Sequence, residues 1–261
     1  MKPPVLLVHG ACSQPAHLEP WRAAFAAMGH ECAVPALPGH AAGEFAALGR
    51  LKLRDYLAAL AEVHGRFDRP PVVVGHSMGG LLAQRLAATV ECAGVVLVAS
   101  MPSGTVPATL GALPYLFELA PAILAGRPFR APPAALAHLT LHDLSAAEQD
   151  ELIPDFVAES GRVYRQILLG RARVSAGAIR CPVLVVHGGA DRLVPVRVAR
   201  RLARKHAAAL TIIPGRGHWL IAGSLMAAVL PVVLDWIGRL GATAGSAATG
   251  LHPSFQKLGD V

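Results

Sequence analysis

The sequence predicts an α/β protein built on a mostly parallel sheet with helices on both faces. Short apolar runs rich in β-branched residues recur along the chain, and segments with apolar residues at three-to-four spacing lie between them. Strands and helices alternating in this order indicate βαβ units, whose parallel strands are covered on both faces. The six runs expected to be strands are residues 5–9, 31–35, 72–75, 94–99, 183–187 and 210–213. The expected helices between them are residues 18–28, 54–65, 78–88 and 196–206.

The alternation breaks once, over residues 101–179, where no strand-like run occurs. Ala- and Leu-rich helical segments cut by prolines fill this stretch, and Ser145 with a glutamate three positions later fits a capping box. Because the insertion is too long for a simple loop, we expect a helical cap over the edge of a core formed by residues 1–100 and 180–240. Residues 241–261, rich in Gly, Ala, Ser and Thr, are expected to form a flexible C-terminal tail.

A nucleophile motif follows the third predicted strand. Gly75, His76, Ser77, Met78 and Gly79 read G-x-S-x-G, between an apolar run and a predicted helix. In that context the serine occupies a strained strand-to-helix turn, and the flanking glycines allow the backbones to approach closely. The turn lifts the serine Oγ clear of the sheet, and the helix N-terminus favours developing negative charge. Ser77 is therefore the candidate nucleophile, and a buried turn serine is the weaker alternative.

The partners of a serine nucleophile can be placed by their order along the chain. The serine needs a histidine base and a group that orients this base, and here the acid is expected first and the histidine after it. Asp191 comes just after the fifth predicted strand, and His218 lies in a glycine-flanked loop after the sixth. Since catalytic groups gather at the carboxyl ends of parallel strands, we expect Ser77, His218 and Asp191 to form a catalytic triad.

The loop after the first predicted strand, residues 8–12, is expected to complete an oxyanion hole. A tetrahedral oxyanion needs two preorganised N–H donors, and one should be the backbone N–H of Met78, the residue after the nucleophile. Gly10 lets the loop turn sharply, so the Ala11 N–H is the first choice for the second donor. The Cys12 N–H is the fallback.

Three side chains are candidates for substrate binding: Cys12, Trp219 and His40. Cys12 lies in the oxyanion loop, Trp219 follows the candidate base, and His40 is expected to line the entrance. His9 and His187 each precede a glycine at a strand end, and we expect them to be structural hydrogen-bonding residues.

Composition excludes several classes of protein. The chain has 261 residues, of which 53% are hydrophobic and 16% charged, so it can bury a large core. The net charge of +7 comes from basic residues that are scattered or fall on one predicted helix face, so no nucleic-acid partner is expected. Prolines interrupt the uncharged stretches 92–117 and 217–234, and no basic amphipathic anchor is present, so no stable membrane anchoring is expected. Without a signal-peptide pattern, the expected location is cytoplasmic.

The cysteines and histidines indicate neither a disulfide framework nor a metal site. Cys12, Cys32, Cys92 and Cys181 form no CxxC pair and have no metal-ligand spacing with the histidines. Free thiols are therefore expected rather than disulfides.

Together these motifs resemble the α/β-hydrolase fold superfamily over residues 3–240. The signals, all in family order, are His9-Gly10, Gly75 to Gly80, residues 188–195 with Asp191, and Gly217-His218. The resemblance implies Ser77 as nucleophile, His218 as base, Asp191 as acid, and no cofactor.

Two further segments narrow the resemblance. Residues 8–12 and 28–31 are similar to the small methylesterase and hydroxynitrile-lyase branch. The lyases of that branch lack the His-Gly pair and carry a lysine beside the catalytic histidine. This chain has Gly10 and Trp219 at those places, so the resemblance favours an esterase.

The sequence therefore predicts a serine hydrolase that cleaves a carboxylic ester of a small to medium apolar acyl group through an acyl-enzyme. The apolar composition of the cap motivates the apolar substrate. A C–C bond hydrolase, an amide hydrolase and a cofactor-free peroxidase stay open, because the same triad serves each. A non-catalytic ligand receptor is disfavoured by the complete triad. The oligomeric state is left open.

Overall fold

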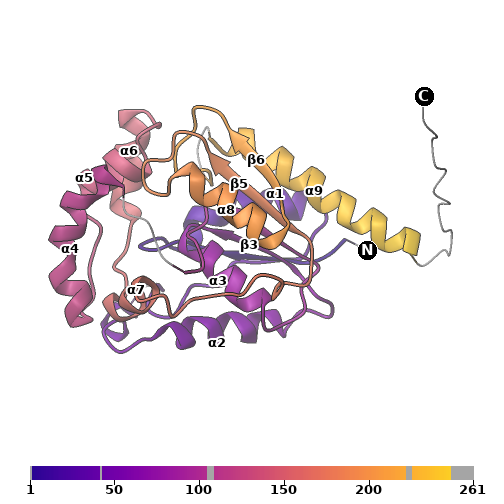
Figure 1. The fold of residues 1–261 in the computed structure, drawn as a ribbon, viewed down its shortest axis with the longest axis horizontal. Helices are drawn as coiled ribbons and strands as arrows, with labels where there is room; N and C mark the ends of the chain where they lie inside the picture. The colour runs from indigo at the N-terminus through magenta and orange to yellow at the C-terminus, as the bar shows by residue number, and fades with distance from the viewer. Residues whose placement is uncertain (1, 42, 105–108, 222–224, 248–261) are drawn as a thin grey trace, which may run out of the picture.

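The computed structural model describes residues 2–41, 43–104, 109–221 and 225–247, with side chains described as far as residue 240. Its centre is a six-stranded sheet in the order β2-β1-β3-β4-β5-β6, in which every neighbouring pair is parallel (Figure 1). The strands are β1 (Val5–Val8), β2 (Cys32–Ala33), β3 (Val72–His76), β4 (Gly94–Val98), β5 (Val183–Gly188) and β6 (Ala209–Ile213). The predicted α/β fold class is confirmed. At the edge strand β2, only two of the five expected residues pair with β1.

The four predicted helices are also present, each within one residue of its expected ends. They are α1 (Glu19–Ala27), α2 (Leu53–His64), α3 (Met78–Ala87) and α8 (Val196–His206). A further helix, α9 (Met226–Ala247), contains Pro231 and continues past residue 240. Residues 241–247 of the expected flexible tail are therefore helical. The rest of that tail, residues 248–261, lies outside the described residues.

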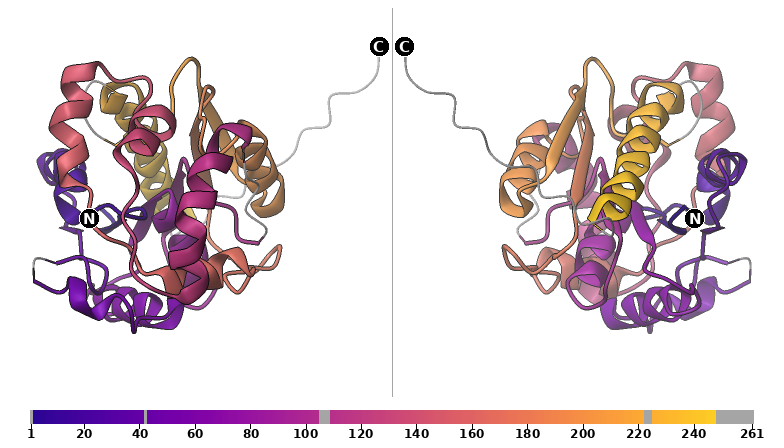
Figure 2. Two further views of the ribbon diagram at one scale, coloured as in Figure 1. Left: turned by 90° about the vertical axis from the view of Figure 1, so that its left-hand side faces the viewer. Right: turned by 90° about the vertical axis from the view of Figure 1, so that its right-hand side faces the viewer.

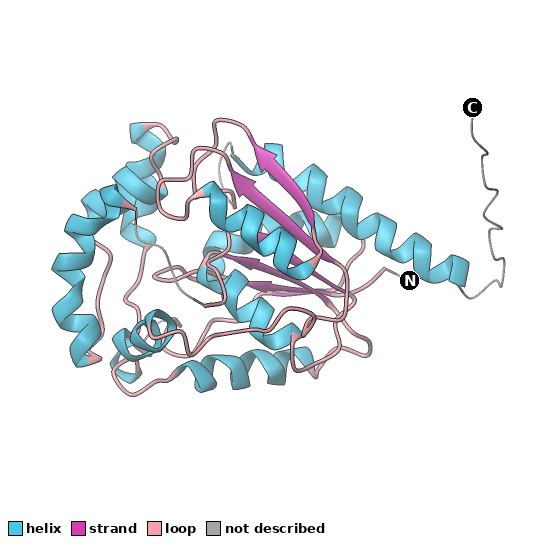
Figure 3. Cartoon of the chain, in the orientation of Figure 1, coloured by secondary structure: helices cyan, strands magenta, loops and turns pink. Residues whose placement is uncertain are grey.

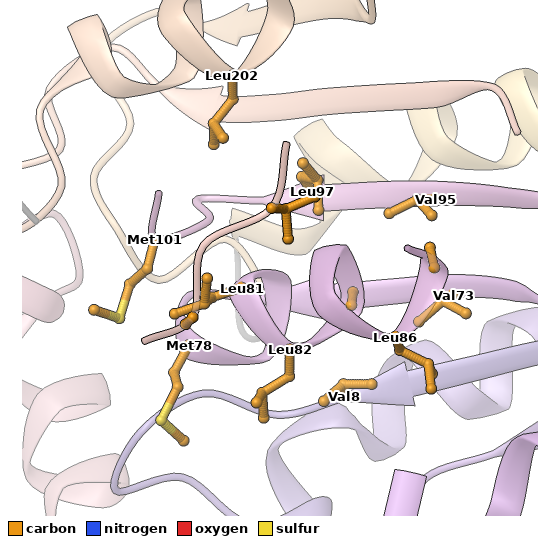
Figure 4. Close-up of a cluster of buried hydrophobic side chains, with 14 of the residues drawn as sticks. Val8, Val73, Met78, Leu81, Leu82, Leu86, Val95, Leu97, Met101 and Leu202 are labelled. Atoms are coloured by element: carbon orange, nitrogen blue, oxygen red, sulfur yellow. The ribbon is translucent and has the colours of Figure 1, made fainter. Parts of the chain in front are cut away.

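Strands β1, β3, β4 and β5 are buried on both faces of the sheet because their successive residues enter different apolar clusters. In β1, Leu6 and Val8 belong to one cluster and Val5 and Leu7 to the other. Helices α2, α3 and α8 pack in the first cluster, and α1 and α9 in the second (Figure 2). Figure 4 shows part of the first cluster, in which strand residues such as Val73 lie beside α3. This two-sided burial explains why the strands read as continuous apolar runs.

The long segment between β4 and β5 is helical. It forms α4 (Leu113–Ala125), α5 (Pro133–Ala135), a π-helical turn (Leu136–Thr140), α6 (Ala146–Leu152) and α7 (Gly161–Leu168). The predicted capping box is confirmed, since Ser145 Oγ accepts the Glu148 N–H at 3.3 Å and the Glu148 carboxylate accepts the Ser145 N–H at 2.9 Å. Helices α4, α5 and α6 lie beyond the carboxyl ends of the strands (Figures 1 and 3). Helix α7 packs against both α4 and α2, and its Val163 and Ile167 join the first cluster.

Candidate active site

Ser77 stands in the turn between β3 and α3 with a backbone φ of +55°. Its N–H donates to the Val98 carbonyl at 3.0 Å, and its own carbonyl accepts the Met101 N–H at 3.0 Å, so the end of strand β4 holds the strained turn. The two flanking glycines are sterically required here. A Cβ on Gly75 would lie 2.3 Å from the Gly79 carbonyl oxygen.

The structure brings the three predicted triad residues together from three strand ends. Nε2 of His218 lies 3.0 Å from Ser77 Oγ, and Nδ1 of His218 lies 2.8 Å from Asp191 Oδ2. All three side chains are buried, with Ser77 7%, Asp191 8% and His218 1% exposed. Because an ionised carboxylate only accepts hydrogen bonds, the His218 proton sits on Nδ1 and leaves Nε2 free to accept the Ser77 proton.

The surroundings of Asp191 keep it ionised. Its Oδ1 accepts the backbone N–H groups of Leu193 at 2.9 Å and Val194 at 2.8 Å. Burial alone would raise the pKa of Asp191, but the charge and hydrogen bond of His218 outweigh it and hold that pKa below its ordinary value. His187 Nε2 lies 2.8 Å from the Val194 carbonyl oxygen and 3.3 Å from Asp191 Oδ2, and burial lowers its pKa. His187 thus braces the Asp191 loop, as a structural histidine would.

The loop after β1 lies against the turn that carries Ser77. A Cβ on Gly10 would lie 3.1 Å from Ser77 Cβ, so the two segments touch. Within the part of the chain that the structure describes, the N–H groups of Ala11 and Met78 have no protein acceptor. The fallback donor is engaged elsewhere, because the Cys12 N–H donates to Glu159 Oε2 at 3.4 Å.

An apolar cavity of about 140 Å³ opens beside Ser77 and His218. Two of the predicted substrate-binding residues, Cys12 and Trp219, line it. The others that line it come mostly from the α4 to π-helical segment and include Leu116, Leu119, Phe129, Leu136, Leu139 and Tyr164.

The expectation that His40 lines the entrance is wrong. His40 is 1% exposed, and its Nε2 lies 3.2 Å from Glu159 Oε2. It therefore belongs to a buried polar cluster with Glu159, away from the cavity. His9, in contrast, accepts the Leu37 N–H at its Nε2 and is fully buried, in line with a structural role.

Two acidic residues of the site were not singled out from the sequence. Glu159 contacts the oxyanion loop, and Asp143 accepts the N–H of Gly217 at 2.7 Å, which fixes the loop of His218. Neither stands in a recognisable motif, so no sequence signal could have marked them. The four cysteines are free, as predicted.

The described residues contain no group of three or more His, Cys, Asp or Glu residues that could hold a metal ion. None of the described helices is both long enough and apolar enough to cross a membrane.

Known proteins resemble this chain in sequence and in fold. The model of the alpha/beta hydrolase family matches residues 5–231. The monoacylglycerol lipase of Mycolicibacterium smegmatis is 29% identical over 177 residues, which cover 64% of this chain. The match spans 62% of that lipase, less than two thirds of its length.

Solved structures share the fold at low sequence identity. The monoacylglycerol lipase of Paleococcus ferrophilus has a TM-score of 0.72 and 20% identity, covering 92% of this chain and 97% of the lipase. Polyneuridine aldehyde esterase gives 0.68 and 16%, covering 92% and 100% of the two chains. A pyrethroid hydrolase from Sphingobium faniae gives 0.68 and 19%, covering 90% and 97%. With the family model matching most of its length, the chain belongs to the alpha/beta hydrolase family.

Proposed function

We propose that the protein is a serine hydrolase that cleaves carboxylic esters of small to medium apolar acyl groups. One observation carries the proposal: the hydrogen-bonded series from Asp191 through His218 to Ser77 ends beside an apolar cavity. The names of the similar proteins, among them lipases and esterases, support ester hydrolysis as the reaction class.

In the proposed mechanism, Ser77 Oγ attacks the ester carbonyl carbon while its proton passes to Nε2 of His218. The electron pair of the carbonyl moves onto its oxygen, and the N–H groups of Met78 and Ala11 stabilise this oxyanion. Collapse of the intermediate expels the alkoxide, which takes the proton from His218. Water then repeats the two steps on the acyl-enzyme, which releases the carboxylic acid and restores Ser77.

The cavity indicates the size of the acyl group. Its volume of about 140 Å³ is close to that of an engineered cavity of roughly 150 Å³ that binds benzene. An acyl chain on the order of six carbons, or a phenyl ring, therefore fits. Its walls are mainly leucine and aromatic side chains, which favour an apolar acyl group over a charged one.

The test is steady-state and burst hydrolysis of p-nitrophenyl acetate, butyrate, hexanoate and octanoate. We expect multiple turnover with the highest kcat/KM at butyrate or hexanoate, and Ser77→Ala to lower kcat by about 10⁴-fold or more. Ser103→Ala is the matched control, because Ser103 is also a buried serine but hydrogen-bonds Lys205 instead of His218. Labelling of Ser77 by a fluorophosphonate without turnover of any ester would mean that Ser77 is a working nucleophile but that the substrate bond is not an ester. No labelling and no turnover would refute it.

A further inference from the structure

We propose that Glu159 is a positioning residue that holds the oxyanion loop in its working conformation. This inference rests on the proposed function, because it concerns the N–H group that would stabilise the oxyanion. Glu159 lies in the segment between α6 and α7, 147 positions along the chain from Cys12, yet it contacts the loop after β1. Its side chain is completely buried.

Both carboxylate oxygens of Glu159 have defined donors. Oε1 accepts the Tyr56 hydroxyl at 2.6 Å and the Ser160 N–H at 2.7 Å. Oε2 lies 3.2 Å from Nε2 of His40 and accepts the Cys12 N–H at 3.4 Å. Buried carboxylates are rare unless they are paired and hydrogen-bonded, and Glu159 satisfies both conditions. The carboxylate is therefore fixed in one orientation, with Oε2 facing the oxyanion loop.

The same segment holds the other side of the Cys12 peptide. The Val157 N–H donates to the Cys12 carbonyl at 2.8 Å, so both backbone groups of Cys12 are bonded to residues 157–159. That segment is itself anchored, because Glu159 and Phe129 exchange two backbone hydrogen bonds of 2.8 and 3.0 Å. The chain between α6 and α7 thus forms a rigid support beneath the loop.

Cys12 needs this support because its backbone is strained. Its φ of +56° lies in the left-handed region that a residue with a side chain rarely adopts, and such conformations persist only where the surroundings hold them. Ala11, whose N–H is the proposed oxyanion donor, immediately precedes it. A relaxed Cys12 would rotate the neighbouring peptide and move that donor, so the hydrogen bonds of Glu159 act on the oxyanion hole through the loop.

An ionisable histidine, His40, faces the Glu159 carboxylate. Burial lowers the pKa of His40, but the hydrogen bond and charge of Glu159 more than compensate and raise it above its ordinary value. The carboxylate of Glu159 therefore favours the protonated form of His40. Four other titratable groups nearby are neutral near pH 7, since burial raises the pKa of Cys12 to about 12, raises those of Tyr56 and Tyr164, and lowers that of His9 to about 3. The charge of Arg130 also acts on Cys12.

Glu159→Gln is a specific probe of this arrangement. The donors at Oε1, Tyr56 and Ser160, would hold the amide oxygen, so the amide NH₂ would take the place of Oε2. That NH₂ cannot accept the Cys12 N–H, whereas the size of the side chain is almost unchanged. The variant therefore removes the hydrogen bond to the loop and the negative charge that faces His40, while the contacts of Oε1 are kept.

The experiment measures kcat and KM for p-nitrophenyl butyrate, together with inhibition by a trifluoromethyl ketone, which forms a tetrahedral oxyanion adduct. We expect Glu159→Gln to lower kcat by about 10- to 100-fold with KM within about twofold, and the ketone to lose affinity in parallel. Butyrate, the product acid, should inhibit with unchanged affinity. Ser160→Ala is the matched control, since it also lies in this buried segment but caps α7 without touching the loop, so its kcat should stay within about twofold.

A kcat of Glu159→Gln within about twofold of the wild type would overturn the inference, as would an equal loss in Ser160→Ala. If Glu159→Gln does not fold, Tyr56→Phe replaces it. Removing the Tyr56 hydroxyl frees one carboxylate oxygen to turn, so kcat should fall by about 3- to 10-fold, and an unchanged kcat would overturn the inference equally. Wild type and Ser77→Ala are assayed in parallel. Loss of turnover in Ser77→Ala with no effect of Glu159 variants would leave the proposed function intact and refute this inference alone.

Discussion

Nε2 of His76 lies 3.0 Å from the backbone carbonyl oxygen of His218, so the residue before Ser77 is hydrogen-bonded to the histidine that faces Ser77. Burial, with a smaller contribution from the charge of His218, lowers the pKa of His76 to about 3, so its ring is neutral. A carbonyl oxygen only accepts, which places the single ring N–H on Nε2. One short hydrogen bond thus ties the serine turn to the histidine loop.

His76→Leu should therefore slow the reaction without preventing folding. The variant leaves the His218 carbonyl without its donor and loosens the loop, so we expect kcat to fall by about tenfold with KM nearly unchanged. His76→Gln keeps a side-chain N–H and should recover part of the loss. Equal kcat values for His76→Leu and the wild type would show that the hydrogen bond does not position His218.

Asp191→Asn tests the orientation of the base. The N–H groups of Leu193 and Val194 would hold the amide oxygen, so the NH₂ group would face Nδ1 of His218 and force the other tautomer. Nε2 would then carry the proton and could not accept one from Ser77. By analogy with the same change in a trypsin-like triad, kcat should fall by about 10⁴-fold, while thermal unfolding shows an intact fold. A loss below tenfold would mean that Asp191 is not the orienting acid.

The chain order and strand-end positions of Ser77, Asp191 and His218 made them predictable, because short local patterns place them. Glu159 was not predictable. Its contact with Cys12 depends on how the segment between α6 and α7 folds back over the core, and no pattern of nearby residues encodes that. The misplacement of His40 has the same origin, since its position in the core is decided by Glu159, a partner 119 positions away.

The helices were predictable where the apolar spacing favoured a helix and the segment joins two parallel strands, as for α8. Helix α9 was missed because Pro231 and the Gly- and Ser-containing end argue locally against a helix. Packing of Val233 and Trp236 in the second cluster overrides that preference.

Leu116→Trp should shorten the preferred acyl chain. Leu116 projects from α4 into the cavity, and an indole there would occupy space that the end of a longer chain needs. The ratio of kcat/KM for octanoate to that for acetate should fall by about tenfold or more, with acetate itself nearly unaffected. Phe117→Ala is the control, because Phe117 is the next residue along α4 but is 76% exposed. A similar change of the ratio in both variants would show that the cavity does not select the acyl chain.

Gly79→Ala tests how closely α3 approaches β1. A Cβ on Gly79 would lie 2.1 Å from the Val8 carbonyl oxygen. That oxygen belongs to the backbone of strand β1 and cannot move away as a flexible side chain could. We expect the free energy of unfolding in urea to fall by about 3 kcal/mol or more. Gly238→Ala is the matched control, because nothing lies within 4 Å of its Cβ and it stands in helix α9. It should stabilise the protein by up to about 1 kcal/mol, and equal effects of the two substitutions would contradict the packing described here.

Stability should decrease as the pH falls below 6.5. Burial lowers the pKa of His9 and His76 to about 3 and the pKa of His17 to about 4. In the unfolded chain the pKa of each histidine is about 6.5. The unfolded state therefore binds more protons between pH 6.5 and 4, so each histidine costs about 1.4 kcal/mol of stability per pH unit in that window. His40 acts in the opposite direction, because its pKa is raised and its contribution is lost as the pH rises, but one such group does not offset three. Urea unfolding at pH 8, 7, 6 and 5 measures the slope, which should be shallower in His17→Phe. A free energy of unfolding that stays constant from pH 7 to 5 would mean that these histidines are protonated in the folded protein.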